Sequence, residues 1–333
     1  IDPVTGGVGD LAVEVYGAGS YMPNSTAYLM SFEVQRSLPF NMTATVGYQG
    51  ALGRKGIRLV NQAYLYDTGE DRRFSAVYFP TPDVNSSYHA LNLVLHKRMS
   101  RGLQIDAAYT WSKSIDQLST EGPGSSSNQT NPAFPATERG LSDYDATHRL
   151  TASGLWELPF LRKRTDWLGR AFGGWQLSSI LTFHTGFPWT PVTGRIQSVQ
   201  VRNADTISPT RPTRYFGGAG SDSSNDAFIT GSNFPLGGPT YFDIENRGQP
   251  GIGRNSFRGP RFFGVDASLF KNVALTERFQ LQLRGNAFNI FNKLNLLPFS
   301  FGTESTTIEN PNFGRSSGAL SGRVIEFQAR LVF

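Results

Sequence analysis

Histidine is the residue of this chain that could take part in the most kinds of chemistry, because it can exchange protons near neutral pH or bind a metal. The four histidines have no metal-binding spacing such as His-Glu-x-x-His, and the absence of cysteine excludes thiolate sites and disulfides. His89 and His148 fall in alternating apolar rows that we expect to face lipid, near strand ends where headgroups lie. The other two are His96 and His184. We therefore expect neither a metal nor a cofactor.

Two other patterns could carry chemistry. Residues 314–318 read GRSSG and match the G-x-S-x-G nucleophile elbow, but they lie in a predicted loop before a strand instead of between a strand and a helix. Asp143 with Asp145, or Asp222 with Asp226, could bind calcium. They lack EF-hand spacing, and a loop made polar for solubility is the alternative. Because no acid, base and nucleophile converge, we predict that the protein is not an enzyme.

The elements that position these side chains are strands, and the clearest is the last. In residues 322–333, GRVIEFQARLVF, every second residue from Ile325 to Phe333 is apolar, and Glu326, Gln328 and Arg330 stand between them. A period of two marks a strand with one apolar and one polar face. About nine segments are predicted as strands on this pattern. They cover about 26–36, 42–60, 88–98, 103–113, 148–157, 175–186, 263–272, 278–290 and 322–333.

The connections between these strands alternate between short or moderate and long along the whole chain. Transmembrane barrels have short periplasmic turns and long extracellular loops, whereas a soluble sandwich has no reason to sort its loops in this way. The longest connection, about 187–261, is also too long for an unstructured loop of a compact soluble domain. The sequence therefore predicts an all-β fold, an antiparallel transmembrane β-barrel with long extracellular loops.

Composition supports a membrane barrel. Aromatic residues make up 13% of the chain and charged residues only 17%, with a mean hydropathy of −0.30. No apolar run approaches the roughly 20 residues of a spanning helix. The net charge of +5 is spread along the chain, so we expect no nucleic-acid partner. Bacterial barrels close with an even number of strands, and the chain begins at Ile1 without a signal peptide, so we expect further strands upstream.

Several strings, in this order and spacing, resemble one family over about residues 88–333. They are YHALN at 88–92, YTWSKSID at 109–116, RGLSDYD at 139–145 followed by His148-Arg149, GWQL at 174–177, FNIFN at 288–292 and NPNFG at 310–314. They look like the carboxy-terminal barrel of Oar-like TonB-dependent receptors, outer-membrane proteins common in Acidobacteria and myxobacteria. The resemblance implies a barrel of about 22 strands with a plug, energised by TonB. It also implies an amino-terminal carboxypeptidase-regulatory-like domain.

The resemblance makes residues 1–333 the carboxy-terminal part of such a barrel, without the plug, TonB box or regulatory-like domain. It implies a receptor in the outer membrane of a Gram-negative bacterium that binds and passes a bulky ligand, not yet identified. Its partners would be outer-membrane lipid and lipopolysaccharide, the barrel assembly machinery, and TonB through the missing part. The alternative is a structural or interaction protein, a barrel-derived surface or assembly subunit that pairs through open strand edges.

Charges that alternate with the apolar rows are predicted to face the lumen. They could form an interlocked ladder that contacts the plug, or line a substrate pathway. From their positions on neighbouring strands, Arg278 or Arg284 could pair with Glu326. The full set is Asp106, Arg149, Glu157, Asp266, Arg278, Arg284, Glu326 and Arg330.

Aromatic residues at the ends of the apolar rows are predicted to form two girdles. Trp111 and Phe183 belong to the outer level and Trp156 and Trp175 to the inner one. Trp175 to Phe183 corresponds to about 20 Å of membrane at a tilt near 40°, which fits the belt height. Phe333, the last residue of the alternating apolar row of the final strand, is also predicted to lie at the inner level.

The row that ends the chain resembles the last-strand signal read by the outer-membrane assembly machinery. It comprises Phe327, Ala329, Leu331 and Phe333. The alternative is that Phe333 only anchors the strand in the inner girdle.

Overall fold

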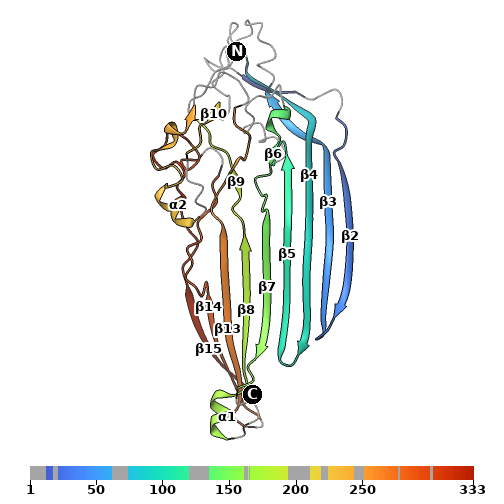
Figure 1. Ribbon diagram of the computed structural model, residues 1–333, viewed down its shortest axis with the longest axis vertical. Helices are drawn as coiled ribbons and strands as arrows, with labels where there is room; N and C mark the ends of the chain where they lie inside the picture. Colours follow the sequence, from blue (N-terminus) through green and yellow to red (C-terminus); the bar gives the residue numbers. More distant parts are fainter. Residues whose placement is uncertain are drawn as a thin grey trace.

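The structure, a computed structural model, describes residues 13–17, 22–61, 74–119, 135–160, 164, 166–193, 211–218, 224–243, 251–276, 278–300 and 303–333. Their main feature is a tall sheet in which nine antiparallel strands follow one another in chain order (Figure 1). These strands are β2 (Thr26–Leu38), β3 (Met42–Asn61), β4 (Phe74–Ser100), β5 (Leu103–Asp116), β7 (His148–Glu157), β8 (Trp175–His184), β13 (Phe262–Ala274), β14 (Gln280–Phe288) and β15 (Val324–Val332). The nine predicted strands and the antiparallel order are confirmed.

One prediction about the strands is wrong. The sequence predicts strands over about 42–60 and 88–98 with a connection between them, but β4 begins at Phe74 and extends well beyond β5. There it pairs with the far end of β3 on one side and, in parallel, with β1 (Val13–Tyr16) on the other. Register shifts in β3 near Gly56 mark the point where this upper part of the ladder begins.

Cross-strand register places the apolar rows of all nine strands on one face of the sheet. Phe32 lies opposite Tyr48, and Tyr48 lies opposite Leu91, which in turn lies opposite Trp111. The same row continues through the later strands to β15, where Leu331 lies opposite Leu281. We call this the apolar face, and the opposite one, rich in Ser, Thr, Asn, Gln and charged residues, the polar face. In an outer-membrane barrel the apolar face contacts lipid and the polar face lines the lumen.

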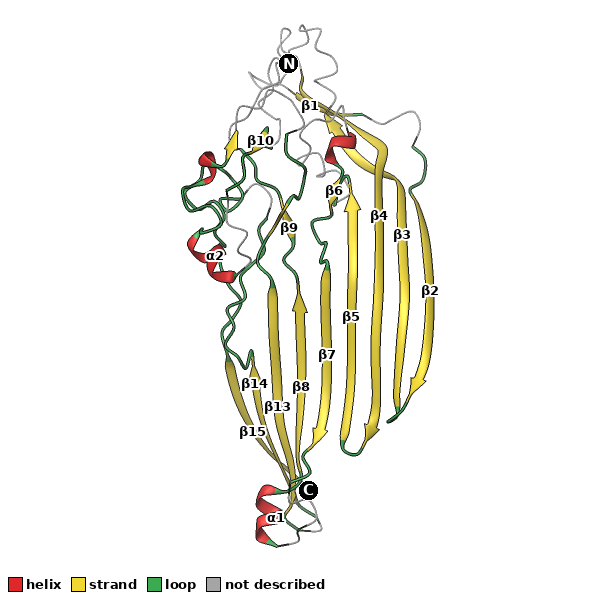
Figure 2. Ribbon diagram, in the orientation of Figure 1, coloured by secondary structure: helices red, strands yellow, loops and turns green. Residues whose placement is uncertain are grey.

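Short turns and long connections lie at opposite ends of the sheet, as predicted (Figure 2). Arg101 and Gly102, both at positive φ, join β4 to β5 in the tight geometry that suits the twist of a hairpin. The connection from β7 to β8 contains a helix, α1 (Trp167–Phe172), capped by Asp166. None of the helices in the described residues is long and apolar enough to cross a membrane.

The long connections carry structure of their own. Their elements are η3 (Pro135–Glu138), β6 (Gly140–Leu141), β9 (Pro188–Trp189), β10 (Arg214–Tyr215), α2 (Asn225–Thr230), η4 (Gly238–Thr240), β11 (Phe242–Asp243) and β12 (Phe257–Arg258). β10 pairs with β11 and β9 pairs with β12. We call the described parts of the connections 117–147, 185–261 and 289–323 the loop assembly. This packed unit continues the sheet at the end away from α1 (Figure 1).

Candidate functional site

Three arginines of the connection 185–261 hold the loop assembly together by binding acids at the end of β5 and in the connection that follows it. Arg254 pairs with Asp116 at the end of β5, and these side chains are 8% and 1% exposed. The same guanidinium donates to the carbonyl oxygens of Glu138 at 2.9 Å and of Asp116 at 3.0 Å. One side chain therefore ties the later connection to β5 and to η3.

The other two arginines make similar contacts. Arg211 donates to Glu138 at 2.9 Å, and both side chains are 2% exposed. Burial lowers the pKa of the Arg211 guanidinium, and the neighbouring charge of Glu138 opposes that shift. Arg258 binds Asp145, which is fully buried, at 2.5 Å. Such buried pairs add little net stability, but a missing partner is costly, so they specify which loops pack together.

Close backbone approach accompanies these ion pairs. A Cβ at position 140 would overlap the carbonyl oxygen of Arg254, so only glycine fits Gly140 between the two connections. Asn255, at φ 56°, donates to the carbonyl of Leu141 at 2.7 Å and exchanges hydrogen bonds with Thr190. The two connections are thus joined by backbone as well as by charge.

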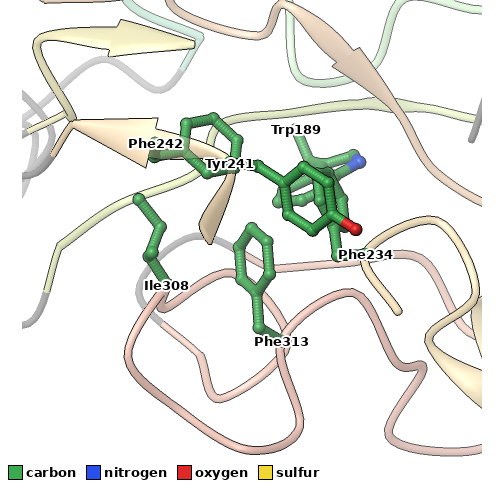
Figure 3. Close-up of a cluster of buried hydrophobic side chains, with 6 residues drawn as sticks. All are labelled: Trp189, Phe234, Tyr241, Phe242, Ile308 and Phe313. Atoms are coloured by element: carbon green, nitrogen blue, oxygen red, sulfur yellow. The ribbon is translucent and has the colours of Figure 1, made fainter. Parts of the chain in front are cut away.

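An aromatic core joins the third connection to the same unit (Figure 3). Phe234 is its centre, with ring centroids 4.7 Å from Phe313 and 5.6 Å from Tyr241. The buried members of the core are Trp189, Phe234, Tyr241, Phe242, Ile308 and Phe313. Val192 also exchanges backbone hydrogen bonds with the segment around Ile308. The loop assembly is therefore one packed body and not three separate loops.

The predicted calcium ligands have a different role in the structure. Asp145 is bound by Arg258, and Asp143 accepts hydrogen bonds from Asn255 at 2.6 Å and Arg254 at 3.3 Å. Asp226 lies in the first turn of α2, and Asp222 is outside the described residues. Within the described ranges no three His, Asp or Glu side chains gather to form a metal site.

The serine of the GRSSG string and the remaining histidines also make structural contacts. Ser316, in the GRSSG string, donates to the carbonyls of Leu297 and Gly318, as expected for a loop and not for a nucleophile elbow. His96 pairs with Asp106 across β4 and β5. His184 stacks on Phe262 at 5.3 Å.

The charges predicted to face the lumen that lie within strands are on the polar face by register, but they do not form a continuous ladder. Asp106 contacts His96, and Asp266 accepts a hydrogen bond from the backbone N–H of Asn289 at 2.8 Å. Arg284 lies over the ring of Phe270 at 5.3 Å.

The predicted pairing of Glu326 is wrong. Glu326 lies opposite Asn286, and among the described residues it forms no ion pair with Arg278 or Arg284. Arg278 precedes β14, at the opposite end of the β14–β15 ladder from Glu326. Arg278 therefore lies beyond the end of the ladder opposite Glu326, and Arg284 contacts Phe270 instead. The remaining polar-face charges are Arg149 and Glu157 on β7 and Arg330 on β15.

The comparisons with known proteins agree with this architecture. The sequence model of the family described as "Outer membrane beta barrel domain" matches residues 4–326. The chain belongs to this family. We call the chain the barrel domain from here on. It accordingly belongs in the outer membrane of a Gram-negative bacterium, and its family is not one of enzymes.

The fold of the barrel domain is similar to parts of several solved structures. The outer membrane transporter YddB from Escherichia coli is similar with a TM-score of 0.52 and 8% identity, over 96% of this chain and 34% of that one. The ferric-catecholate import receptor Fiu from E. coli has a TM-score of 0.45 and 10% identity, over 98% and 31% of the two chains. The barrel domain thus shares its fold with part of YddB and spans about a third of the length of that protein. No curated protein sequence matches it.

The predicted girdle residues of the barrel domain all lie on the apolar face. Trp111, opposite His148, and Phe183, opposite Leu150, are near the long connections. Trp156 and Trp175 are near the short turns, where Lys271 lies over the Trp175 ring at 5.4 Å. Their role in a membrane girdle stays a prediction.

Sequence reasoning missed Arg211, Arg254 and Arg258, the residues that organise the loop assembly of the barrel domain. Their partners lie far away in the sequence; Arg254 and Asp116, for example, are separated by 138 positions. No periodicity marks such contacts, because they depend on how two connections fold over each other. The only local signal was the RGLSDYD string, which contains two of the acids, Asp143 and Asp145.

Proposed function

We propose that this chain forms part of the barrel of an Oar-like TonB-dependent receptor that binds a bulky ligand and passes it through a plugged lumen. The observation that carries the proposal is the two-faced sheet, with an apolar face for lipid and a polar face for a lumen, continued by a packed loop assembly outside the membrane. The family strings in the sequence support the receptor subtype. The ligand would be recognised at the loop assembly and moved without covalent chemistry.

The open edges of the sheet support a larger barrel. In the described part of the chain, no strand pairs with the outer edge of β2 or of β15. Unpaired backbone groups are costly in lipid, so a membrane-spanning sheet must close on itself. We propose that further strands of the same polypeptide close the barrel, and that the same polypeptide supplies the plug, the TonB box and the regulatory-like domain.

Capture of TonB tests this function. The full-length protein, purified in detergent, is expected to retain the periplasmic domain of TonB on a column, and more strongly once its ligand is bound. A matched protein from which the TonB box is deleted should not retain it. Absence of binding by the intact protein would contradict the receptor assignment.

A second function, a surface or assembly subunit, is favoured by the same open edges. β2 is exposed along its whole length and could accept a strand from another chain. Single-particle structure determination of the full-length protein separates the two functions. Pairing of β2 with an earlier strand of the same polypeptide supports the receptor, whereas pairing with a second polypeptide supports the subunit.

The polar-face charges are proposed to contact the plug or the passing ligand. Arg149, Glu326 and Arg330 are exposed on that face and, within the described residues, make no ion pair. Exposed charges without an ion-pair partner are suited to bind polar groups of the plug or of the ligand in the lumen.

Deletion of Phe333 tests the proposed assembly signal. Phe327 and Phe333 are 87% and 91% exposed on the apolar face, and the Phe327 ring covers the backbone of Gly285 on β14. Burial of one aromatic residue is worth only about 1.5–3 kcal/mol at equilibrium. The deletion should therefore reduce the yield of inserted protein far more than it reduces the melting temperature of barrels already inserted. Equal insertion rates of deletion and parent in an assembly assay would leave only an anchoring role.

A further inference from the structure

A basic patch lies on the apolar face at the end nearest the long connections. Lys113 on β5 lies directly opposite His89 on β4, and Trp111 lies directly opposite His148 on β7. All of these side chains belong to the row that faces lipid. Three groups able to carry positive charge thus lie within one step of register on three adjacent strands.

The histidines of this patch are held by tyrosines of neighbouring strands. The Tyr48 hydroxyl lies 2.7 Å from Nδ1 of His89, and the Tyr109 hydroxyl lies 2.7 Å from Nδ1 of His148. The ring centroids in both pairs are 6.1 Å apart. With Nδ1 occupied by a tyrosine, Nε2 remains as the donor with which each imidazole can bind a ligand.

The charge of the patch is not balanced on this face. In the described residues Lys113 is exposed and forms no ion pair. Between His89 and Lys97 of β4, and in the stretches of β3, β5 and β7 that face it, the apolar-face rows contain no aspartate or glutamate. The acid farther along β4, Asp83, pairs with Arg58. By contrast, the lysine at the other end of the β4 row, Lys97, donates to Ser100 Oγ at 2.6 Å and to the Leu103 carbonyl at 3.0 Å. Along β4 and β5 the open charge therefore lies at the outer end.

We propose that His89, Lys113 and His148 bind a phosphate group of lipopolysaccharide on the outer surface of the barrel. The patch lies one register step beyond Trp111, where the hydrocarbon belt gives way to headgroups. The outer leaflet at that level holds lipopolysaccharide, whose lipid A part has phosphates on a sugar core above its acyl chains. The acyl chains would lie along Leu91 and Trp111, while lysine and imidazole donors bind the phosphate by charge-assisted hydrogen bonds.

Lipid binding to the full-length protein in detergent, followed by native mass spectrometry, tests the proposal. The parent is expected to bind bisphosphorylated lipid A about tenfold more tightly than the same lipid after enzymatic removal of its phosphates, and more tightly than phosphatidylglycerol. No preference for the phosphorylated form would overturn the proposal. Equal binding of phosphatidylglycerol would overturn the choice of lipopolysaccharide. This arm needs no variant, so it does not depend on how substitutions affect folding.

Variants locate the site. Lys113→Gln should weaken binding of bisphosphorylated lipid A about fivefold, and the triple variant with His89→Gln and His148→Gln should lose the preference for phosphate altogether. Arg36→Gln is the matched control, since it removes one charge from the apolar-face row of β2 near the short turns. It should bind like the parent. An unchanged preference in the triple variant, or an equal loss in the control, would place the phosphate elsewhere.

Discussion

Replacing Arg254 by methionine is expected to open the loop assembly, with a loss of about 3–5 kcal/mol in local stability. The substitution would leave the carboxylate of Asp116, which is 1% exposed, without its counter-ion. It would also remove the donor from the buried carbonyls of Glu138 and Asp116. Hydrogen exchange of peptides from residues 135–147 and 251–261 would measure the change, as a more than hundredfold faster exchange.

Two variants control this experiment. Arg164→Met breaks an ion pair with Asp166 in which the side chains are 53% and 40% exposed, so exchange of the loop assembly should not change. A double variant, Arg254→Met with Asp116→Leu, removes both charges and should recover part of the lost protection. If Arg254→Met left exchange at the parent level, the ion pair would not be what joins these connections.

Replacing Phe234 by alanine is expected to cost about 3–5 kcal/mol, because the ring is buried and a cavity would remain between the connections. Phe234 has ring contacts with the core members Trp189 and Phe242 and with Phe257, which is partly buried and packs against the core. Exchange should accelerate in residues 224–243 and also in 303–323, since Ile308 and Phe313 share this core. Acceleration in 303–323 distinguishes a shared core from a local defect.

Phe216→Ala is the matched control for this substitution. Phe216 belongs to the same connection but is largely exposed, so its removal should change stability by no more than about 0.5 kcal/mol. Similar effects of the two alanines would show that the core does not organise the loop assembly.

The strands could be predicted because each one buries a single face. Shifting a strand by one residue would turn its apolar row from lipid to lumen, so alternation is strongly specified in segments such as 103–113. The upper part of β4 was missed because Pro80 and Pro82 interrupt its pattern. The ladder with β5 ends at Ser86, and an edge position tolerates proline because fewer backbone bonds are needed there.

The loop assembly could not be predicted for a different reason. Its aromatic residues, such as Phe234 and Phe313, follow no period, and polar composition alone indicated only irregular loops. Their burial depends on partners from other connections. For the same reason the sequence placed Glu326 on the correct face but with the wrong neighbour, since register decides the opposite residue and alternation decides only the side.

The shared core of the loop assembly limits how such proteins can be recombined. A chimera that took only residues 289–323 from a relative would bring foreign side chains to the positions of Ile308 and Phe313, while Trp189 and Phe234 stayed behind. The exchange would leave mismatched shapes in a close-packed interior. A chimera that took the whole stretch from Trp189 to Phe313 would instead keep the core residues together. Its Arg211 and Arg254 would still find their partners if the recipient has Asp116 and Glu138.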